Sequence, residues 1–248
     1  MTTSRRVENE PAWVLHHRPF RDTSRILDIL SRDHGRLSLV ARGSRSVKSR
    51  LKGILRPFMP LSISWVSRSD LGTLTGADII QGPLTLSGDA LLSAYYVNEL
   101  LLKLLHKHDP QPGIFDIYSE VIAGLAVGDD VALSLRRFEI DLLSMLGYAL
   151  NLHHDSDSQQ ELVPDQLYAY RPELGPVPVT NRDGPTVFTG AELVAIREQE
   201  FEKKEVLRDA GRLLRDVIAF HLDGKELKSR KVLMEMRQSD RKQASKGS

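Results

Sequence analysis

The sequence predicts an α+β protein in which a small β-barrel is followed by a bundle of helices. Up to residue 83, apolar residues alternate with polar ones in short runs separated by Gly, Pro, Ser or Asp, which is typical of strands. From Ser87 onward the apolar residues take the spacing of amphipathic helices. The segment 151–188 follows neither period, and we expect it to be an irregular insert.

Five short strands are expected in the first part of the chain, over 12–18, 24–31, 36–42, 58–67 and 73–81. In the third, Leu37, Leu39 and Ala41 share one face, and mainly polar residues occupy the other. Five such strands favour a small barrel, of which the OB-fold is a common nucleic-acid-binding type. Residues 43–56 then form the loop between the third and fourth strands.

Helices are expected over 89–108, 113–126, 130–146, about 203–222 and near 226–236, with a further helix that opens at Thr189. Asp130 is placed to cap the helix expected over 130–146. Gly147 is placed to end that helix in the left-handed conformation. Thr189 and Glu192 have the spacing of a capping box.

These patterns divide the chain into an OB-fold domain, a helical domain in two parts with an insert between them, and a polar tail that we expect to be disordered. The boundaries are 1–83 for the barrel, 84–150 and 189–236 for the helical parts, 151–188 for the insert and 237–248 for the tail.

The composition excludes several classes of protein. The chain has no cysteine, so disulfides, thiolate catalysis and cysteine zinc sites are excluded. The N-terminus lacks the apolar core of a signal peptide, and no apolar run reaches the roughly 20 residues of a membrane helix. We therefore expect a cytoplasmic protein, associated with the nucleoid if it binds DNA.

A block of positive charge stands out in a chain whose formal net charge is only +1. From Gly35 to Ser69 it has eight Lys or Arg residues and no acid. A folded surface of one sign attracts a polyanion and releases its counterions, which favours nucleic-acid binding over an ordinary solvated surface. The candidate contacts are Arg36, Arg42, Arg45, Lys48, Arg50, Lys52 and Arg56.

Aromatic residues near this block are few. Phe20, Phe58 and Trp65 could stack on bases, but a place in the core is the simpler expectation for each.

Motifs for catalysis or metal binding are absent from the sequence. It contains no phosphate-binding loop, no dinucleotide fingerprint and no nucleophile elbow, so we expect neither an enzyme nor a cofactor. His153 and His154 with Asp155 and Asp157 come nearest to a metal cluster, but their spacing is not that of a reliable site, and solvated loop residues are the better interpretation.

Arg136 and Arg137 lie in a helix that is apolar on more than one face. An arginine beside such a surface can hold a terminal carboxylate while the apolar groove takes a side chain, which is one way to capture a peptide end. The alternative is that these arginines pair with Glu139, Asp141 or another helix. The sequence leaves both open.

Five blocks in this order resemble the RecO family of bacterial recombination mediators: AWVLHHRPFRDTSRILDILSRDHGRLSLVARGSRSVKSRLKGILRPFMPL, LSAYYVNELLLKLL, ALSLRRFEIDLLSMLGY, FTGAELVAI and GKELKSRKVL. The resemblance covers nearly the whole chain. It implies an OB-fold and a helical domain, binding of single- and double-stranded DNA, and annealing of complementary strands in recombinational repair.

The same resemblance implies partners. They are RecR, RecF in some pathways, and single-strand binding protein, which RecA replaces on DNA. The contact with single-strand binding protein is implied to be through its C-terminal tail. Many family members also carry a four-cysteine zinc finger between the helical segments, where this chain has the cysteine-free residues 151–188. The resemblance therefore implies no metal here. An RNA-binding OB protein, a protein-interaction adaptor that does not bind DNA, and a nuclease are the alternatives.

Overall fold

A computed structural model describes residues 5–184, 186–229 and 231–232. The chain forms two compact units, one holding the residues up to Gly128 together with the segment from Leu227, the other holding Asp129–Glu226. Each is described separately below. No helix among the described residues is long and apolar enough to cross a membrane.

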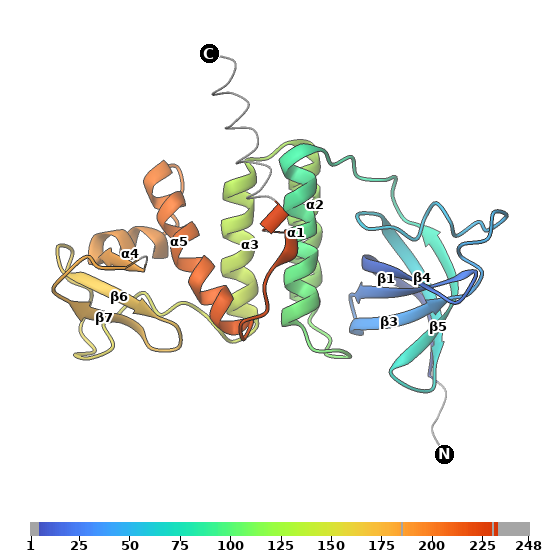
Figure 1. The fold of residues 1–248 in the computed structure, drawn as a ribbon, viewed down its shortest axis with the longest axis horizontal. Coiled ribbons are helices and arrows are strands. Elements are labelled where there is room, and N and C mark those ends of the chain that lie inside the picture. Colours follow the sequence, from blue (N-terminus) through green and yellow to red (C-terminus); the bar gives the residue numbers. More distant parts are fainter. Residues whose placement is uncertain (1–4, 185, 230, 233–248) are drawn as a thin grey trace, which may run out of the picture. The chain divides into compact units, whose positions relative to one another are not determined.

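The first unit begins with a closed five-stranded barrel (Figure 1). Its strands are β1 (Arg5–Phe20), β2 (Ser24–Ser31), β3 (Gly35–Ala41), β4 (Pro60–Ser67) and β5 (Leu71–Ile79). They follow the order β1-β2-β3-β5-β4, with β3 and β5 parallel and the other pairs antiparallel. This is the expected OB-type barrel, and the predicted fold class is confirmed.

Alternation decides which side chains fill the barrel. Leu37, Leu39 and Ala41 of β3 point inward with Leu61 and Ile63 of β4, all at most 3% exposed. Because side chains alternate across a strand, the intervening polar residues point outward.

The first strand is longer than predicted. It starts at Arg5 and not at residue 12, since its first half pairs with β4 and its second half with β2. Charged residues and Pro11 hide this first half in the sequence, and a register shift between Val7 and Glu10 interrupts its alternation.

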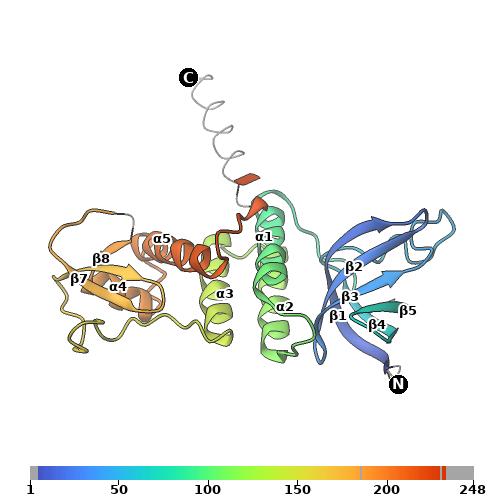
Figure 2. The same ribbon diagram turned by 60° about the horizontal axis from the view of Figure 1, so that its bottom comes forward.

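Two helices, α1 (Gly88–Leu104) and α2 (Pro112–Val127), lie side by side (Figures 1 and 2), and α1 packs on β1 of the barrel. Asn98 of α1 donates to the backbone oxygen of Leu15 at 2.8 Å and accepts from the Tyr118 hydroxyl at 2.8 Å. Trp13 Nε1 donates to Ser119 Oγ at 3.0 Å. These polar contacts, of which those of Asn98 are buried, join the barrel to the first two helices.

The loop between α1 and α2 explains why α1 ends four residues before the predicted residue 108. This loop lies against the β2–β3 turn, where His108 N donates to Arg36 O at 2.8 Å. Gly35 has φ +66°, and a Cβ there would lie 2.1 Å from Asp109 O. Only glycine fits so close an approach of two backbones.

The C-terminal segment returns to α1. Glu99 accepts hydrogen bonds from Lys228 N at 3.0 Å, from Ser229 N at 2.9 Å and from the Ser229 hydroxyl at 2.7 Å. Residues 228, 229, 231 and 232 are helical, as expected near 226–236. The rest of that predicted helix beyond 232, and the predicted tail 237–248, lie outside the described residues.

The second unit contains α3 (Val131–Met145), α4 (Gly190–Arg197) and α5 (Lys204–His221), with α5 packed on the other two. The capping predictions are confirmed. Asp130 accepts from Leu133 N at 2.8 Å, Gly147 has φ +81°, and Thr189 and Glu192 form a complete capping box.

The predicted irregular insert is partly a sheet, which corrects the interpretation of 151–188. The strands β6 (Leu167–Arg171), β7 (Gly175–Val179) and β8 (Val187–Thr189) form a three-stranded antiparallel sheet in the order β7-β6-β8. Pro176 and Pro178 argued against strands in the sequence. They are tolerated because β7 is an edge strand, which needs hydrogen-bond donors on one side only.

Candidate nucleic-acid interface

The basic loop lies where the sequence predicts it, between β3 and β4 (Figure 1). Six of its side chains belong to exposed residues, namely Arg42, Arg45, Lys48, Arg50, Lys52 and Arg56. None of the six forms an ion pair with an acid within the described part of the chain. Their charges are therefore available to an anionic partner.

The loop is folded, although it contains no regular helix or strand. Successive turns join Ser46 N to Gly43 O at 3.0 Å and Ser49 N to Ser46 O at 3.0 Å. Four of its apolar side chains pack into the barrel: Leu55 is fully buried, Met59 is 2% exposed, and Leu51 and Ile54 are partly buried against the core, whereas Val47 is exposed. This arrangement closes one end of the barrel and leaves the cations on the outside.

The β1–β2 turn adds cations that the sequence analysis did not include. Arg45 Nη1 donates to Arg21 O at 3.3 Å, and Arg25 Nη1 donates to Leu55 O at 3.5 Å. Arg21 is exposed, and its guanidinium lies 5.2 Å from the centre of the Phe20 ring. The pairing of β2 with the end of β3 creates this proximity. The signal in the sequence is the run RPFRDTSR at 18–25, with three arginines and one acid.

Arg36 has a different setting from the other six predicted contacts. It is half-buried, and its Nε donates to Leu105 O at 3.1 Å. Burial lowers the pKa of Arg36, and the nearby Asp28 carboxylate opposes that change. The Arg36 side chain thus holds the α1–α2 loop on β3.

The three aromatic residues considered for base stacking differ in burial. Trp65 and Phe58 are buried, at 4% and 6% exposure, in agreement with the expected core role. Phe20 is half-buried beneath Arg21.

The fold places the two arginines of α3, Arg136 and Arg137, in different environments. Arg136 Nη2 donates to Glu139 Oε1 at 2.9 Å, and the Glu139 side chain is 2% exposed. A Cβ at Gly211 of α5 would lie 2.8 Å from Arg136 Nη1, so this guanidinium fills the contact between α3 and α5. Arg137 is exposed. The geometry supports internal pairing for Arg136 and leaves Arg137 accessible.

The segment 151–166 shows how the candidate metal residues are used. The Asp155 carboxylate accepts from Asp157 N at 2.9 Å and from Ser158 N at 2.6 Å, and hydrogen bonds from Ser158 lower the pKa of Asp155. Among the described residues, no three His, Asp or Glu side chains are grouped to hold a metal ion.

Comparison with known proteins matches both parts of the chain. Residues 5–83 match the family model "Recombination protein O N terminal", and residues 86–231 match "Recombination protein O C terminal". The chain belongs to the RecO family.

Proteins named as members of this family are similar to the chain over nearly its full length. "DNA repair protein RecO" of Dechloromonas aromatica (strain RCB) is 40% identical over 242 residues, covering 96% of this chain and 100% of that protein. The protein of the same name in Azoarcus sp. (strain BH72) is 40% identical over 240 residues, covering 95% of this chain and 99% of that protein. That of Nitrosococcus oceani is 40% identical over 235 residues, covering 94% and 95%.

Proposed function

We propose that this RecO family member acts in recombinational DNA repair, by binding single- and double-stranded DNA and annealing complementary strands. The observation that carries the proposal is the row of six exposed, unpaired cations on a loop anchored in an OB-type barrel. The family membership and the names of its relatives support the role in repair.

Annealing needs no covalent chemistry, so no catalytic residue is required. Two polyanionic strands repel each other, and a basic surface that holds both reduces this repulsion. Bases must remain free to pair, so the loop should contact phosphates. Arginine suits this task because its guanidinium can donate two parallel hydrogen bonds to one phosphate.

The proposed partners are RecR and single-strand binding protein, with RecF and RecA acting in the same process. A C-terminal tail of single-strand binding protein ends in a carboxylate, and of the α3 pair Arg137 is the exposed residue that could receive it.

The decisive experiment measures annealing of complementary strands coated with the cognate single-strand binding protein, with and without this protein. We expect acceleration by the wild type and its loss in the variant with Arg45, Lys48, Arg50 and Lys52 changed to Ala. A matched control removes four exposed cations of the second unit, Arg171, Lys204, Arg215 and Lys225. The control should retain annealing.

The rival functions give different results. Absence of acceleration by the wild type, with no DNA binding, would refute the proposal and favour an adaptor. Stronger binding to RNA than to DNA of the same sequence would favour an RNA-binding protein. Cleavage of labelled DNA in the presence of magnesium would indicate a nuclease.

A further inference from the structure

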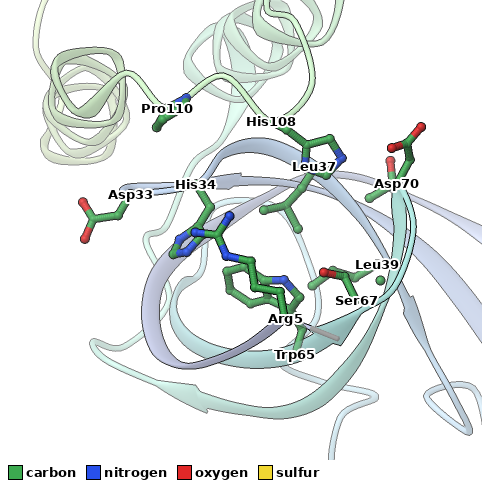
Figure 3. Close-up of a pocket in the computed structure, with 12 residues that line it drawn as sticks. Arg5, Asp33, His34, Leu37, Leu39, Trp65, Ser67, Asp70, His108 and Pro110 are labelled. Atoms are coloured by element: carbon green, nitrogen blue, oxygen red, sulfur yellow. The ribbon is translucent and has the colours of Figure 1, made fainter. Parts of the chain in front are cut away.

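The two ends of the barrel differ. The loop 42–59 closes the end where β3 finishes, and Leu55 and Met59 of this loop belong to the core. At the opposite end, where β3 and β5 begin, a cavity of about 160 Å³ opens into the barrel (Figure 3). Roughly 20 Å, the length of the seven-residue β3, separates the ends. The cavity is therefore separate from the basic loop.

The inner wall of the cavity is apolar and sized for one ring. It includes Leu37, Leu39 and Trp65. Gly72 also lines it, and a Cβ there would lie 2.7 Å from Leu39 Cδ2 and 3.3 Å from Trp65 Cδ1. A cavity of about 150 Å³ accommodates benzene, so this one has room for a single six-membered ring but not for a fused two-ring system.

The rim of the cavity is polar and offers both donors and acceptors. Figure 3 shows the Arg5 guanidinium beside the His34 imidazole, with Asp70 and His108 across the opening. The Ser67 side chain also faces it. A ligand that carries alternating carbonyl and N–H groups on the edge of a ring would satisfy such a rim.

His34 is held in a fixed position. Its ring meets the Trp65 ring edge-on, with centroids 5.1 Å apart, and its Nδ1 lies 3.4 Å from Glu10 Oε1. The buried Glu10 is itself fixed, because it accepts from Asp33 N at 2.7 Å and from the Ser31 hydroxyl at 3.0 Å. A polar group held in this way is preorganised for binding.

From this geometry we propose that the open end of the barrel binds one pyrimidine base. The apolar wall contacts the ring, and the rim residues pair with its polar edge. A plain hydrocarbon ring would leave the desolvated rim groups without partners, which is unfavourable. The proposal rests on the DNA-binding function only for the source of the base, which would be a strand; a free nucleoside carries the same chemistry.

The binding test uses tryptophan fluorescence. The chain has two tryptophans, so Trp13→Phe leaves Trp65 at the cavity as the only tryptophan, which is excited selectively at a wavelength that tyrosine hardly absorbs. We expect uridine and thymidine to change this emission saturably, with a Kd on the order of 1 mM, as for small ligands with few contacts. Adenosine and guanosine should bind at least about tenfold more weakly, because their two rings exceed the cavity. Equal binding of all four, or no saturation, would overturn the proposal.

Two variants and one control variant show whether the site is this cavity. Ser67→Phe fills it and should abolish uridine binding, whereas Ser62→Phe places the same ring on the same strand outside the cavity and should not. His34→Gln keeps a polar group but loses the ring and its fixed position, and should weaken binding about tenfold through the loss of one preorganised hydrogen-bonding partner. Wild-type affinity in both Ser67→Phe and His34→Gln would place any binding elsewhere.

A last comparison identifies the source of the base and separates the two proposals. An oligothymidylate should bind more tightly than an abasic strand of equal length, and Ser67→Phe should remove this difference. If uridine fails to bind while the basic-loop variant loses DNA, the cavity proposal is wrong and the DNA function stands. If uridine binds but the loop variant holds DNA normally, the cavity stands and the loop function fails.

Discussion

The cations of the loop 42–56 and the arginine pair of α3 occupy contrasting electrostatic settings. In the loop, turns present six cations to solvent while Leu55 anchors the backbone in the barrel. In α3, Arg136 is tied to the buried Glu139 and enclosed by Gly211 of α5. Removing one partner of a buried ion pair leaves the other charge uncompensated, and only unpaired charge can bind a polyanion without first breaking a contact.

The largest expected effect is on DNA binding by the loop. Changing Arg45, Lys48, Arg50 and Lys52 to Ala should flatten the log–log dependence of single-strand affinity on salt by about 2 to 3, since each lost phosphate contact contributes about 0.7. At 0.1 M salt this corresponds to roughly a hundredfold to thousandfold weaker binding. Fluorescence anisotropy at several salt concentrations measures both. An unchanged slope in the folded variant would show that the loop does not touch DNA.

The next largest effect is on the free energy of unfolding, which should differ between the Ala variants of Arg136 and Arg137. Arg136→Ala leaves the buried Glu139 without its arginine, and removing one partner of a buried ion pair costs about 3 kcal/mol of the free energy of unfolding. Arg137→Ala, at an exposed position, should cost less than about 0.5 kcal/mol. Urea unfolding of the two variants makes the comparison.

The same two variants test capture of the partner tail. Binding of a tail peptide should fall with Arg137→Ala and not with Arg136→Ala, provided the latter is folded. An amidated peptide should mimic the Arg137 change on the wild type. If Arg136→Ala is as stable as the wild type and loses the peptide, Arg136 is a binding residue and its pairing with Glu139 is incidental.

Arg36 and Arg42 give a smaller contrast within the basic block itself. Arg36→Ala removes the hydrogen bond to Leu105 O, which should lower stability by about 1 kcal/mol and leave the salt dependence of DNA binding unchanged. Arg42→Ala should instead flatten the log–log salt dependence of DNA binding by about 0.7. Its free energy of unfolding should stay within about 0.5 kcal/mol of the wild-type value. Thermal unfolding and salt titration of both variants decide the matter. A reduced slope for Arg36→Ala would return Arg36 to the DNA-contacting set.

The smallest expected effect concerns Glu99, a charged side chain that, like Arg136, already has hydrogen-bond partners within the folded chain. Partial burial alone would raise the pKa of Glu99, but hydrogen bonds from Ser229 and Lys228 lower the pKa below its ordinary value of 4.5. A lowered pKa in the folded state means that the ionised carboxylate stabilises the fold above about pH 4.5, and that this contribution is lost as the pH falls through the folded-state value.

Hydrogen exchange of the Lys228 and Ser229 amides from pH 6 to pH 3, corrected for intrinsic rates, follows this contact. Protection should decrease only at the acidic end. Glu99→Gln should lower protection already at pH 6, and it should reduce the further loss on acidification. Equal protection in the wild type and in Glu99→Gln throughout would show that the carboxylate does not hold the segment.

The sequence by itself determined the class of the fold, the position of the basic loop and the capped ends of α3 and α4. These features rest on local physics. Alternation defines a strand such as β3, and an oxygen at Asp130 or Thr189 satisfies amides only three residues away. Local patterns failed at β1, whose first half depends on pairing with β4, and at β7, where the prolines are acceptable only at a sheet edge.

Tertiary structure alone decided which charges are free. Arg36 and Arg42 look alike in the sequence, yet the α1–α2 loop accepts a hydrogen bond from one and leaves the other in solvent. Arg21 joins the basic surface because β2 pairs beside the end of β3, and the cavity is lined by residues from four strands and from the α1–α2 loop that only the fold brings together. Partners distant in the chain set the burial and pairing of a side chain, and the sequence pattern around a residue carries no record of them.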